Sequence, residues 1–425
     1  MDKLVGKDFK KLAGELIVPA DKSMSHRAII FSSLAKGKSI IKNFSNAQDP
    51  YSTLQVCRSL GIEIEVCGST IEINSDGEFS LPTENLDCGN SGTTMRLMAG
   101  ILAGQKFNST LKGDKSLSKR PMKRIIEPLE LMGANIKSNN FHAPLIISGK
   151  KLHGINYISK ISSAQVKSCI LLAGLNAEGT TTFEEPYLSR NHSEILLKYM
   201  GANINTNGTT VTISKSELKP INIEIFGDVS SAAYFMVAAL IIPNSNIILK
   251  NVGLNPTRSG IIDIIKQMNG NIEILDSREI CGEQVGDIRI KYSPDLTATN
   301  ISSELIPRLI DEIPVIAVLA TQAKGQTIIK DAQDLRNKES DRISTTVKQL
   351  QKLGANIKET TDGMVINGKT PLTGGVEVDS NKDHRLAMSL YVAGMITSKE
   401  ITIRDFDWVK ISFPEFEKLM DSIKI

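Results

Sequence analysis

Cysteine and histidine are scarce in this chain, and their distribution excludes several classes of protein. The five cysteines among 425 residues include no CxxC pair and no evident disulfide framework, which favours a reduced, cytosolic protein over a disulfide-stabilised one. The five histidines are scattered, without the ligand spacing of known metal sites. We therefore expect neither a metal nor a cofactor.

Long hydrophobic runs and a large excess of one charge are also missing. No apolar run approaches the length of a membrane span, and the first residues, Met1–Leu4, lack the profile of a signal peptide. The formal net charge is only +3 and the basic residues are dispersed, which argues against nucleic-acid binding. We expect a cytoplasmic protein with no membrane or nucleic-acid partner. The sequence does not reveal the oligomeric state, and a monomer is the working expectation.

The chain does contain a sixfold internal repeat with a period of about 70 residues. In each copy, a polar cluster opens a strongly apolar run that is typical of a buried helix. The clusters are Lys22–Arg27, Asn90–Arg96, Ser162–Lys167, Asp228–Ser231, Asp311–Pro314 and Lys382–Arg385. If the repeats pack alike, several positive helix ends that carry Lys and Arg converge on one place. That place should hold anions.

The remainder of each copy repeats as well. A short β-like segment follows the apolar helix, and a second, amphipathic helix ends in a recurring phrase. The phrase occurs as Leu60–Ile62, Met132–Ile136, Met200–Ile204, Met268–Ile272 and Leu353–Ile357, with an eroded sixth copy at Met420–Ile423. A helix that stops on Gly or Asn in the left-handed region and re-enters a strand explains the phrase. The alternative is a set of unrelated helix caps in an ordinary α/β protein.

The length and the repeats together predict two domains. A chain of 425 residues exceeds what one hydrophobic core usually supports. Six repeats divide into three and three, with a hinge near Phe226–Asp228. The last repeat ends without room for its closing strands, and a strand around Gly6–Leu12 is expected to complete it. The prediction is one domain over 20–227 and a discontinuous one over 1–19 and 228–425, with hinges near 20 and 227.

Two of the clusters carry groups that suit an anionic ligand. Lys22, Ser23 and Arg27 combine a point charge, a neutral donor and a planar fork, which suits phosphate and carboxylate. The alternative is a capped helix with a solvated basic face. In the second cluster, Gly92 would let backbone N–H groups approach an anion closely. An ordinary helix N-cap explains that turn equally well.

Cations recur at matching positions in the loops that follow the β-like segments. Arg120 precedes Pro121 in one such loop. The equivalent loops contain Arg190, Arg258, Lys338–Arg342 and Lys410. Five matching cations favour a shared anion site over five independent solvated surfaces.

Two carboxylates lie among these cations. Asp311 and Glu339 would repel an anionic ligand, so their presence indicates proton transfer. The alternatives are a helix N-cap for Asp311 and a salt bridge to Arg342 for Glu339. Two histidines in the clusters, His26 and His384, are further candidates for moving protons.

The motifs resemble those of EPSP synthases, the 3-phosphoshikimate 1-carboxyvinyltransferases. The matching stretches are Lys22–Arg27, Leu86–Arg96, Lys119–Met122, Ser163–Ser168, Gly227–Ala232, Leu335–Arg342 and Asp383–Arg385. The resemblance implies a two-domain inside-out α/β barrel, with three βαβαββ repeats in each domain and an active site in the interdomain cleft. It also implies a shikimate-pathway reaction that transfers the enolpyruvyl group of phosphoenolpyruvate to the 5-hydroxyl of shikimate 3-phosphate and releases phosphate.

The resemblance also implies roles for individual residues. Shikimate 3-phosphate would be held by Lys22, Ser23, Arg27, Ser163, Gln165, Asp311 and Lys338. Phosphoenolpyruvate would be held by Lys22, Gly92, Arg120, Gln165, Arg342, Arg385 and Lys410. Asp311, Glu339 and Lys22 would be catalytic. Asp311 would act on the attacking hydroxyl, Glu339 would move the proton to and from the methylene carbon, and Lys22 would contact both substrates.

One departure concerns Lys410. Members of the family often have a Lys just before Thr-Phe-Pro, whereas here Lys410 lies one residue further from the Phe413–Pro414 pair. Either a loop adjustment brings Lys410 to the site or the role is absent in this chain.

Two other functions remain as alternatives. The related UDP-N-acetylglucosamine enolpyruvyl transferases use a reactive Cys in a mobile loop near the position of Leu111–Pro121, and this stretch contains no Cys. Cys88 is better explained as a small buried residue. A non-catalytic anion-binding protein on the same scaffold is the second alternative, against which Asp311 and Glu339 argue.

Overall fold

The computed structural model describes all residues, 1–425, and contains two compact units. Unit 1 consists of Met1–Pro19, Phe226–Arg278 and Gln284–Ile425. Unit 2 consists of Ala20–Ile225 together with the short segment Glu279–Glu283. That segment is the tip of the hairpin formed by β16 (Asn271–Ile280) and β17 (Glu283–Lys291). The chain therefore changes unit at 19/20, at 225/226 and on either side of this tip.

Unit 2 contains three four-stranded sheets, one for each repeat, in the orders β14-β3-β5-β4, β6-β7-β9-β8 and β10-β11-β13-β12. The strands are β3 (Gly37–Lys42), β4 (Glu63–Cys67), β5 (Thr70–Ser75), β6 (Leu86–Asp87), β7 (Asn108–Lys112), β8 (Asn135–Asn139), β9 (His142–Ser148), β10 (Asn156–Ile158), β11 (Thr180–Glu184), β12 (Ile204–Asn207), β13 (Thr210–Ser214) and β14 (Asn222–Glu224). In each sheet the first strand pairs parallel with the second, and the other pairs are antiparallel. This is the sheet expected of a βαβαββ repeat.

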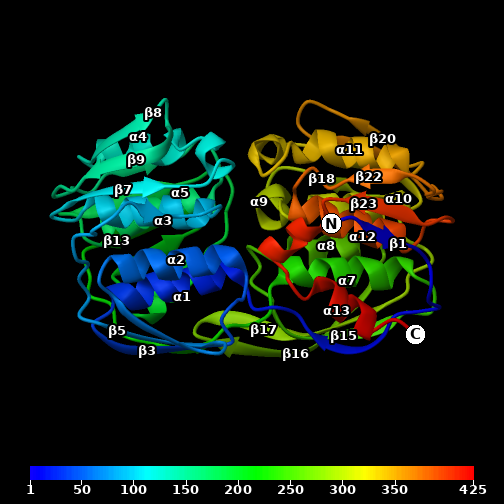
Figure 1. Cartoon of the computed structure of the whole chain (residues 1–425), viewed down its shortest axis with the longest axis horizontal. Helices are drawn as coiled ribbons and strands as arrows, with labels where there is room; N and C mark the ends of the chain where they lie inside the picture. The colour runs from blue at the N-terminus through cyan, green and yellow to red at the C-terminus, as the bar shows by residue number, and fades with distance from the viewer. The chain divides into compact units, whose positions relative to one another are not determined.

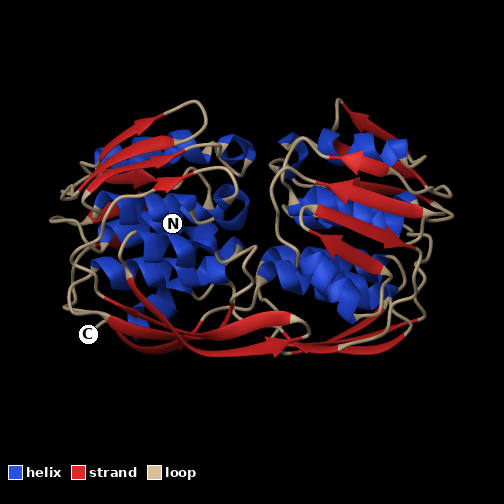
Figure 2. Cartoon of the chain, turned by 180° about the vertical axis from the view of Figure 1, so that it is seen from behind, coloured by secondary structure: helices blue, strands red, loops and turns tan.

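The helices of unit 2 alternate between buried and amphipathic. The apolar helices α1 (Lys22–Leu34), α3 (Gly92–Ala103) and α5 (Ala164–Gly174) are buried over most of their length. The amphipathic helices are α2 (Gln48–Ser59), α4 (Lys123–Leu131) and α6 (His192–Tyr199). Within each unit the strands lie outside and the helices inside (Figure 2), so the expected inside-out α/β fold is confirmed.

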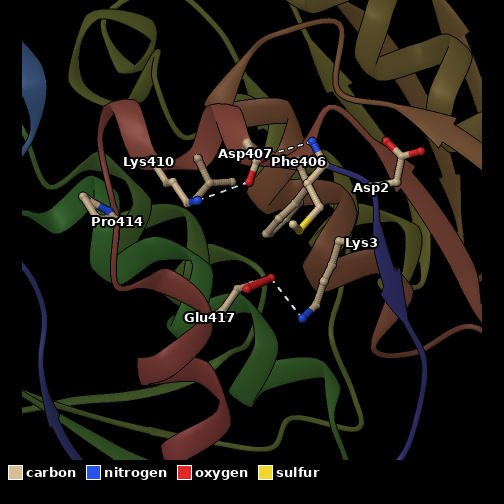
Figure 3. A pocket seen from close by; sticks show the side chains of 9 residues that line it. Asp2, Lys3, Phe406, Asp407, Lys410, Pro414 and Glu417 are labelled. Atoms are coloured by element: carbon tan, nitrogen blue, oxygen red, sulfur yellow. Dashed lines mark hydrogen bonds and ion pairs between the residues drawn. The ribbon is translucent and has the colours of Figure 1, made fainter.

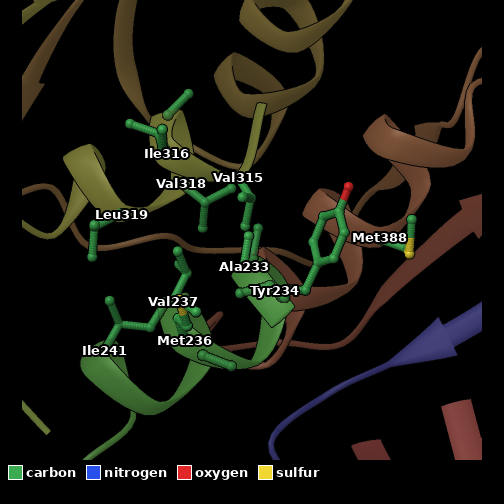
Figure 4. Close-up of a cluster of buried hydrophobic side chains, with 14 of the residues drawn as sticks. Ala233, Tyr234, Met236, Val237, Ile241, Val315, Ile316, Val318, Leu319 and Met388 are labelled. Carbon is green, nitrogen blue, oxygen red and sulfur yellow. The ribbon is translucent and has the colours of Figure 1, made fainter. Parts of the chain in front are cut away.

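Unit 1 repeats this plan with sheets β16-β17-β15-β2, β18-β19-β21-β20 and β1-β23-β22. Its remaining strands are β1 (Lys3–Val5), β2 (Ala13–Ile17), β15 (Asn246–Gly253), β18 (Asn300–Ile301), β19 (Gly325–Ile329), β20 (Asn356–Glu359), β21 (Met364–Gly368), β22 (Glu377–Asp379) and β23 (Ile401–Arg404). Its helices are α7 (Val229–Ile241), α8 (Gly260–Gln267), α9 (Leu305–Leu309), α10 (Ile313–Thr321), α11 (Arg342–Lys352), α12 (His384–Gly394) and α13 (Phe416–Ser422). Side chains of α7, α10 and α12 form the centre of its core (Figure 4).

The recurring phrase has the conformation that the sequence predicted. Helices α2, α4, α6, α8 and α11 each end one residue before the Leu or Met of the phrase. The second residue of the phrase then has a positive φ, at Gly61 (89°), Gly133 (97°), Gly201 (92°), Asn269 (60°) and Gly354 (92°). An L residue adopts this left-handed conformation at a cost, and Gly or Asn lowers that cost. A strand begins within three residues in every case.

The N-terminal stretch does complete the sixth repeat, but with a different segment from the one expected. Strand β1, Lys3–Val5, pairs antiparallel with β23, whereas the sequence placed the strand around Gly6–Leu12 (Figure 1). Lys3–Val5 directs Val5 into the core, while residues 6–11 are mostly Gly, Lys and Asp and have no apolar alternation to bury. Lys10 N and Lys11 N instead donate to Ile425 O at 2.7 and 3.1 Å.

Candidate active site

All six polar clusters lie at the starts of buried helices, as the repeat predicted. Helices α1, α3, α5, α7, α10 and α12 begin at Lys22, Gly92, Ala164, Val229, Ile313 and His384. Four of these helices have an N-cap residue whose side chain accepts a hydrogen bond from a backbone N–H of the first turn. These N-cap residues are Asp21, Ser91, Asp228 and Asp383. These caps satisfy donors that a helix start otherwise leaves open. None of the helices of the structure is long and apolar enough to cross a membrane.

The first cluster of unit 2 is held by an ion pair and by hydrogen bonds. Lys22 Nζ lies 2.9 Å from Asp49 Oδ2. The Arg27 guanidinium is buried and donates to Ser193 Oγ at 2.8 Å, to Ser168 Oγ at 3.0 Å and to the backbone oxygen of Ser23 at 3.0 Å. Burial lowers the pKa of Arg27 to about 10, so it remains a cation at neutral pH.

The start of α3 is crowded by guanidinium groups. A Cβ at Gly92 would lie 2.7 Å from Arg96 Nη1 and 3.4 Å from Arg120 Nη1, so a larger residue here would displace these guanidinium groups. Arg96 Nη1 donates to Gln165 Oε1 at 2.6 Å, and Arg120 Nη2 donates to Asn90 Oδ1 at 2.9 Å. Arg96 belongs to the motif that carried the resemblance, but no role was predicted for it.

The start of α5 is tied to the start of α3 through one of the predicted residues. Gln165 Nε2 donates to Thr93 Oγ1 at 2.9 Å while its oxygen accepts from Arg96. Ser163 is the N-cap residue of α5, and its side chain makes no capping hydrogen bond. Gln165, Gly92 and Arg120 are therefore brought together within unit 2 around Arg96.

Helix α5 also contributes to a buried ion cluster, which is centred on Lys167. Lys167 Nζ lies 2.7 Å from Glu185 Oε1 and 2.7 Å from Glu194 Oε1, and it donates to Ser189 O at 3.1 Å. The side chain of Lys167 is 0% exposed and that of Glu194 is 4% exposed. Burial raises the pKa of Glu194, and the Lys167 ammonium opposes that rise. The cluster joins α5 to α6, the two helices whose serines hold Arg27.

His26 belongs to a buried chain of hydroxyl groups. His26 Nδ1 lies 2.6 Å from Thr53 Oγ1, Thr53 Oγ1 lies 2.7 Å from Thr94 Oγ1, and Thr94 Oγ1 donates to Ser91 Oγ at 2.7 Å. Because each hydroxyl has one proton, Thr53 donates to Thr94 and His26 Nδ1 donates to Thr53. Burial, assisted by Lys22 and Arg27, lowers the pKa of His26 to about 3. The ring is neutral at physiological pH.

Acid sensitivity of folding should follow from this neutral histidine. The unfolded chain binds a proton at His26 below its ordinary pKa of 6.5, whereas the folded chain does not until about 3. The free energy of unfolding should therefore fall as pH falls from 6.5 towards 4, by up to about 1.4 kcal/mol per pH unit from this residue. Urea titrations across this pH range measure how the free energy of unfolding depends on pH. In His26→Gln this dependence should be weaker by the contribution of His26, whereas in His142→Gln, a variant at the surface, it should match that of wild type. Equal slopes in wild type and His26→Gln would contradict the expectation.

In unit 1, Arg342 gathers three carboxylates. Its Nη1 lies 3.3 Å from Asp311 Oδ1, its Nη2 lies 2.6 Å from Glu339 Oε2, and its Nε lies 2.8 Å from Asp383 Oδ2. Burial alone would lower the pKa of Arg342, but these carboxylates outweigh it and raise that pKa. The salt bridge considered for Glu339 is thus present. The N-cap position of α10 is Glu312, the residue after Asp311.

Arg385 lies in the same buried region. It is the second residue of α12 and is 5% exposed. Burial opposes its charge, but the neighbouring Tyr234, Asp311, Asp228 and Glu312 hold the pKa of Arg385 well above its ordinary value. Unit 1 therefore brings together Arg342, Arg385, Asp311 and Glu339.

Two predicted lysines have local acidic partners. Lys338 Nζ lies 2.7 Å from Asp334 Oδ2, four residues earlier. Lys410 Nζ lies 3.3 Å from Asp407 Oδ1, and its side chain is 68% exposed. Lys410 lines a cavity of about 160 Å³ with Met1–Lys3, Phe406, Asp407, Val409, Pro414 and Glu417 (Figure 3). The role of Lys410 in substrate binding remains a prediction.

All five cysteines are free thiols. Cys57, Cys88 and Cys169 are buried, and burial raises the pKa of each thiol, to about 12 for Cys57 and Cys169. A buried thiol of high pKa is a poor nucleophile. Cys88 therefore has the environment of a packing residue, as expected.

Comparison with known proteins agrees with this geometry. The family model for EPSP synthase (3-phosphoshikimate 1-carboxyvinyltransferase) matches residues 7–420. The 3-phosphoshikimate 1-carboxyvinyltransferase of Thermodesulfovibrio yellowstonii is 52% identical over 98% of this chain and 99% of its own length. That of Bacillus licheniformis is 50% identical over 96% of both chains.

Solved structures give the same result. An EPSP synthase from Acinetobacter baumannii is 40% identical, with a TM-score of 0.89 over 100% of this chain and 98% of its own. The enolpyruvyl transferase NikO from Streptomyces tendae has a TM-score of 0.80 over 99% of this chain and 97% of its own, and at 16% identity that likeness shows the fold alone. On the full-length matches, this chain belongs to the EPSP synthase family.

Proposed function

We propose that this chain transfers the enolpyruvyl group of phosphoenolpyruvate to the 5-hydroxyl of shikimate 3-phosphate and releases phosphate. The observation that carries the proposal is the cluster in which the buried Arg342 pairs with two partly exposed carboxylates, Asp311 and Glu339. An anion site built for binding alone would be better without these carboxylates. In a chain of this family, a cation flanked by two acids supports binding of an anion together with proton transfer.

The proposed steps use the two acids in sequence. Asp311 takes the proton of the 5-hydroxyl as its oxygen attacks C2 of phosphoenolpyruvate, and Glu339 delivers a proton to the methylene carbon. Glu339 then takes one proton back from the resulting methyl group as the C–O bond to phosphate breaks. The double bond is restored, and the proton that Asp311 took from the hydroxyl passes to the departing phosphate, which leaves as HPO4²⁻. Both acids return to their starting states, so protons and electrons balance.

The cations would hold the four anionic groups of the two substrates. We assign phosphoenolpyruvate to Arg342, Arg385, Gly92, Arg120, Gln165 and Lys22, with Lys410 as a further candidate. We assign shikimate 3-phosphate to Lys22, Ser23, Arg27, Ser163, Gln165, Asp311 and Lys338. Holding both substrates in register lowers the barrier through orientation.

The direct test is phosphate release by the purified chain. Release should require phosphoenolpyruvate and shikimate 3-phosphate together and should stop when either is omitted. UDP-N-acetylglucosamine should not replace shikimate 3-phosphate. Binding of both ligands without release would instead favour the non-catalytic alternative.

We further propose that units 1 and 2 act as the two domains, with hinges near 20 and 227, and that the substrates draw them together. Each unit contributes cations to the proposed site. Those of unit 2 are Lys22, Arg27 and Arg120, and those of unit 1 are Lys338, Arg342 and Arg385. Their mutual repulsion favours an open arrangement until an anion binds both sets. In small-angle scattering, the radius of gyration should fall when shikimate 3-phosphate saturates the protein. An unchanged radius would count heavily against this proposal. The same scattering data give the molecular mass, which should be that of a monomer. We also propose that the protein acts in the cytoplasm.

Arg385→Lys should weaken the interaction with phosphoenolpyruvate by roughly 1.5–3 kcal/mol, because lysine keeps the charge but loses the planar fork. Turnover should be measured over a range of phosphoenolpyruvate concentrations, and the affinity for phosphoenolpyruvate should be measured by calorimetry. Arg404→Lys is the matched control, since Arg404 is an exposed arginine of the same unit that pairs with Glu377 at 2.9 Å. Unchanged donor affinity and turnover would remove Arg385 from the site.

A further inference from the structure

A buried arginine, Arg258, joins the starts of two helices in unit 1. Its side chain is 3% exposed. Arg258 Nη1 donates to Glu312 Oε1 at 3.0 Å, and its Nη2 lies 3.3 Å from Asp228 Oδ1. Nη2 also donates to Ser230 Oγ. The planar fork thus spreads its hydrogen bonds over groups from two different helices, which a single ammonium cannot do.

Both carboxylates occupy N-cap positions. Asp228 caps α7 and accepts the backbone N–H of Ser230 at 2.8 Å, while Glu312 is the N-cap residue of α10. Ser230 Oγ donates to the same Glu312 oxygen that Arg258 contacts. The other oxygen, Glu312 Oε2, is buried without a hydrogen-bond partner. The position of Glu312 therefore depends on Arg258 and Ser230.

Glu312 is the neighbour in sequence of Asp311. Asp311 directs Oδ1 to Arg342 Nη1 at 3.3 Å, so a shift at the start of α10 would alter that distance. The negative charges of Asp311, Asp228 and Glu312 also act together on Arg385. Arg258 offsets two of these three charges. It therefore affects both the carboxylate and the cation that the proposed reaction uses.

We propose that Arg258 is a positioning residue for the reaction. By clamping Glu312 against the start of α7, it fixes the Asp311 carboxylate beside Arg342. This inference rests on the proposed function, because it concerns the geometry of the base. Arg258 itself contacts no reacting atom in this scheme.

The test compares Arg258→Lys with wild type and with Arg308→Lys. Arg308 is a suitable control because it donates to Pro256 O at 2.6 Å and pairs with Asp263, so it braces the same loop without contacting Glu312. In Arg258→Lys, kcat should fall about 10- to 100-fold, the effect of a small misplacement of a reacting group. Affinity for shikimate 3-phosphate should stay broadly similar, since most of the residues proposed to hold this substrate lie in unit 2. Arg308→Lys should retain kcat.

A second variant, Glu312→Gln, breaks the clamp from the other side and should lower kcat in the same direction. Turnover is expressed per molecule that binds shikimate 3-phosphate, which removes unfolded protein from the comparison. If Arg258 has a purely structural role, the variants should have lower thermal stability but an unchanged kcat per binding-competent molecule. That result in either folded variant would contradict the proposed positioning role of Arg258. Wild type serves as the separate test of function: no turnover in wild type overturns the proposed reaction rather than the clamp alone.

Discussion

Replacing Asp311 with asparagine should lower turnover by a factor of about 10² to 10⁴ while shikimate 3-phosphate still binds with broadly similar affinity. Asparagine keeps the shape and a hydrogen-bonding oxygen but cannot accept the proton of the attacking hydroxyl. The oxygen that lies 3.3 Å from Arg342 Nη1 would become a neutral amide atom. Binding should persist because the other residues proposed to hold this substrate, among them Ser23, Arg27 and Ser163, are unchanged.

The N-cap position of α10 belongs to Glu312, so the competing role for Asp311 is a purely structural one as a partner of Arg342. Asparagine keeps an oxygen that can accept from Arg342, so turnover would then stay nearly normal. Thermal stability, ligand affinity and turnover should be measured on one preparation, with Asp263→Asn as a surface control in the same unit. Near-normal turnover in a stable Asp311→Asn protein would refute the catalytic assignment.

Replacing Lys167 with methionine should lower the free energy of unfolding by about 3–5 kcal/mol, the usual result of removing one partner from a buried ion pair. Methionine fills much of the same volume but leaves Glu185 and Glu194 buried without their cation. Urea unfolding of the folded protein measures the change. Lys151→Met is the control, because Lys151 pairs with Glu178 where both side chains are exposed, at 75% and 64%. Exposed pairs contribute little.

A second comparison separates charge from packing at Lys167. The triple variant Lys167→Met, Glu185→Gln, Glu194→Gln has no unpaired charge and should recover much of the lost stability. If the triple variant is as unstable as Lys167→Met alone, the loss comes from packing. A loss no greater than that of Lys151→Met would contradict the prediction altogether.

The repeat made most of the fold predictable from sequence. The amphipathic helices of the first five repeats each end two residues before a Gly or Asn, because the chain leaves the helix through a left-handed residue there, as at Gly133 and Asn269. Helix starts were equally predictable, because capping chemistry is encoded within three or four residues. Strand β1 was misplaced because its three residues carry almost no periodic signal, and its partner β23 lies at the other end of the chain.

The buried polar networks were the least predictable part of the site. Lys167, Arg258 and the His26 chain are held by residues 18 to 54 positions away in sequence, and only the packing of helices brings these groups together. The residue types were visible in the sequence, but nothing in it distinguishes a cation aimed at a ligand from one that pairs with a helix cap. Lys338 and Lys410 show the opposite case, since their partners lie four and three residues away and were readable from spacing alone.

The pairing of β1 with β23 has a consequence for how the protein is made. Lys3–Val5 are synthesised long before their partners, because Lys3 pairs with Ile403, 400 positions later in the chain. Apart from the hairpin tip, unit 2 is continuous over 20–225, so it can collapse while translation continues. The sheet of the sixth repeat cannot form until β23 has been synthesised. We therefore expect that, in nascent chains halted shortly before residue 400, unit 2 is already folded and resists proteolysis. Lys3–Val5 should still be accessible to the protease in these chains.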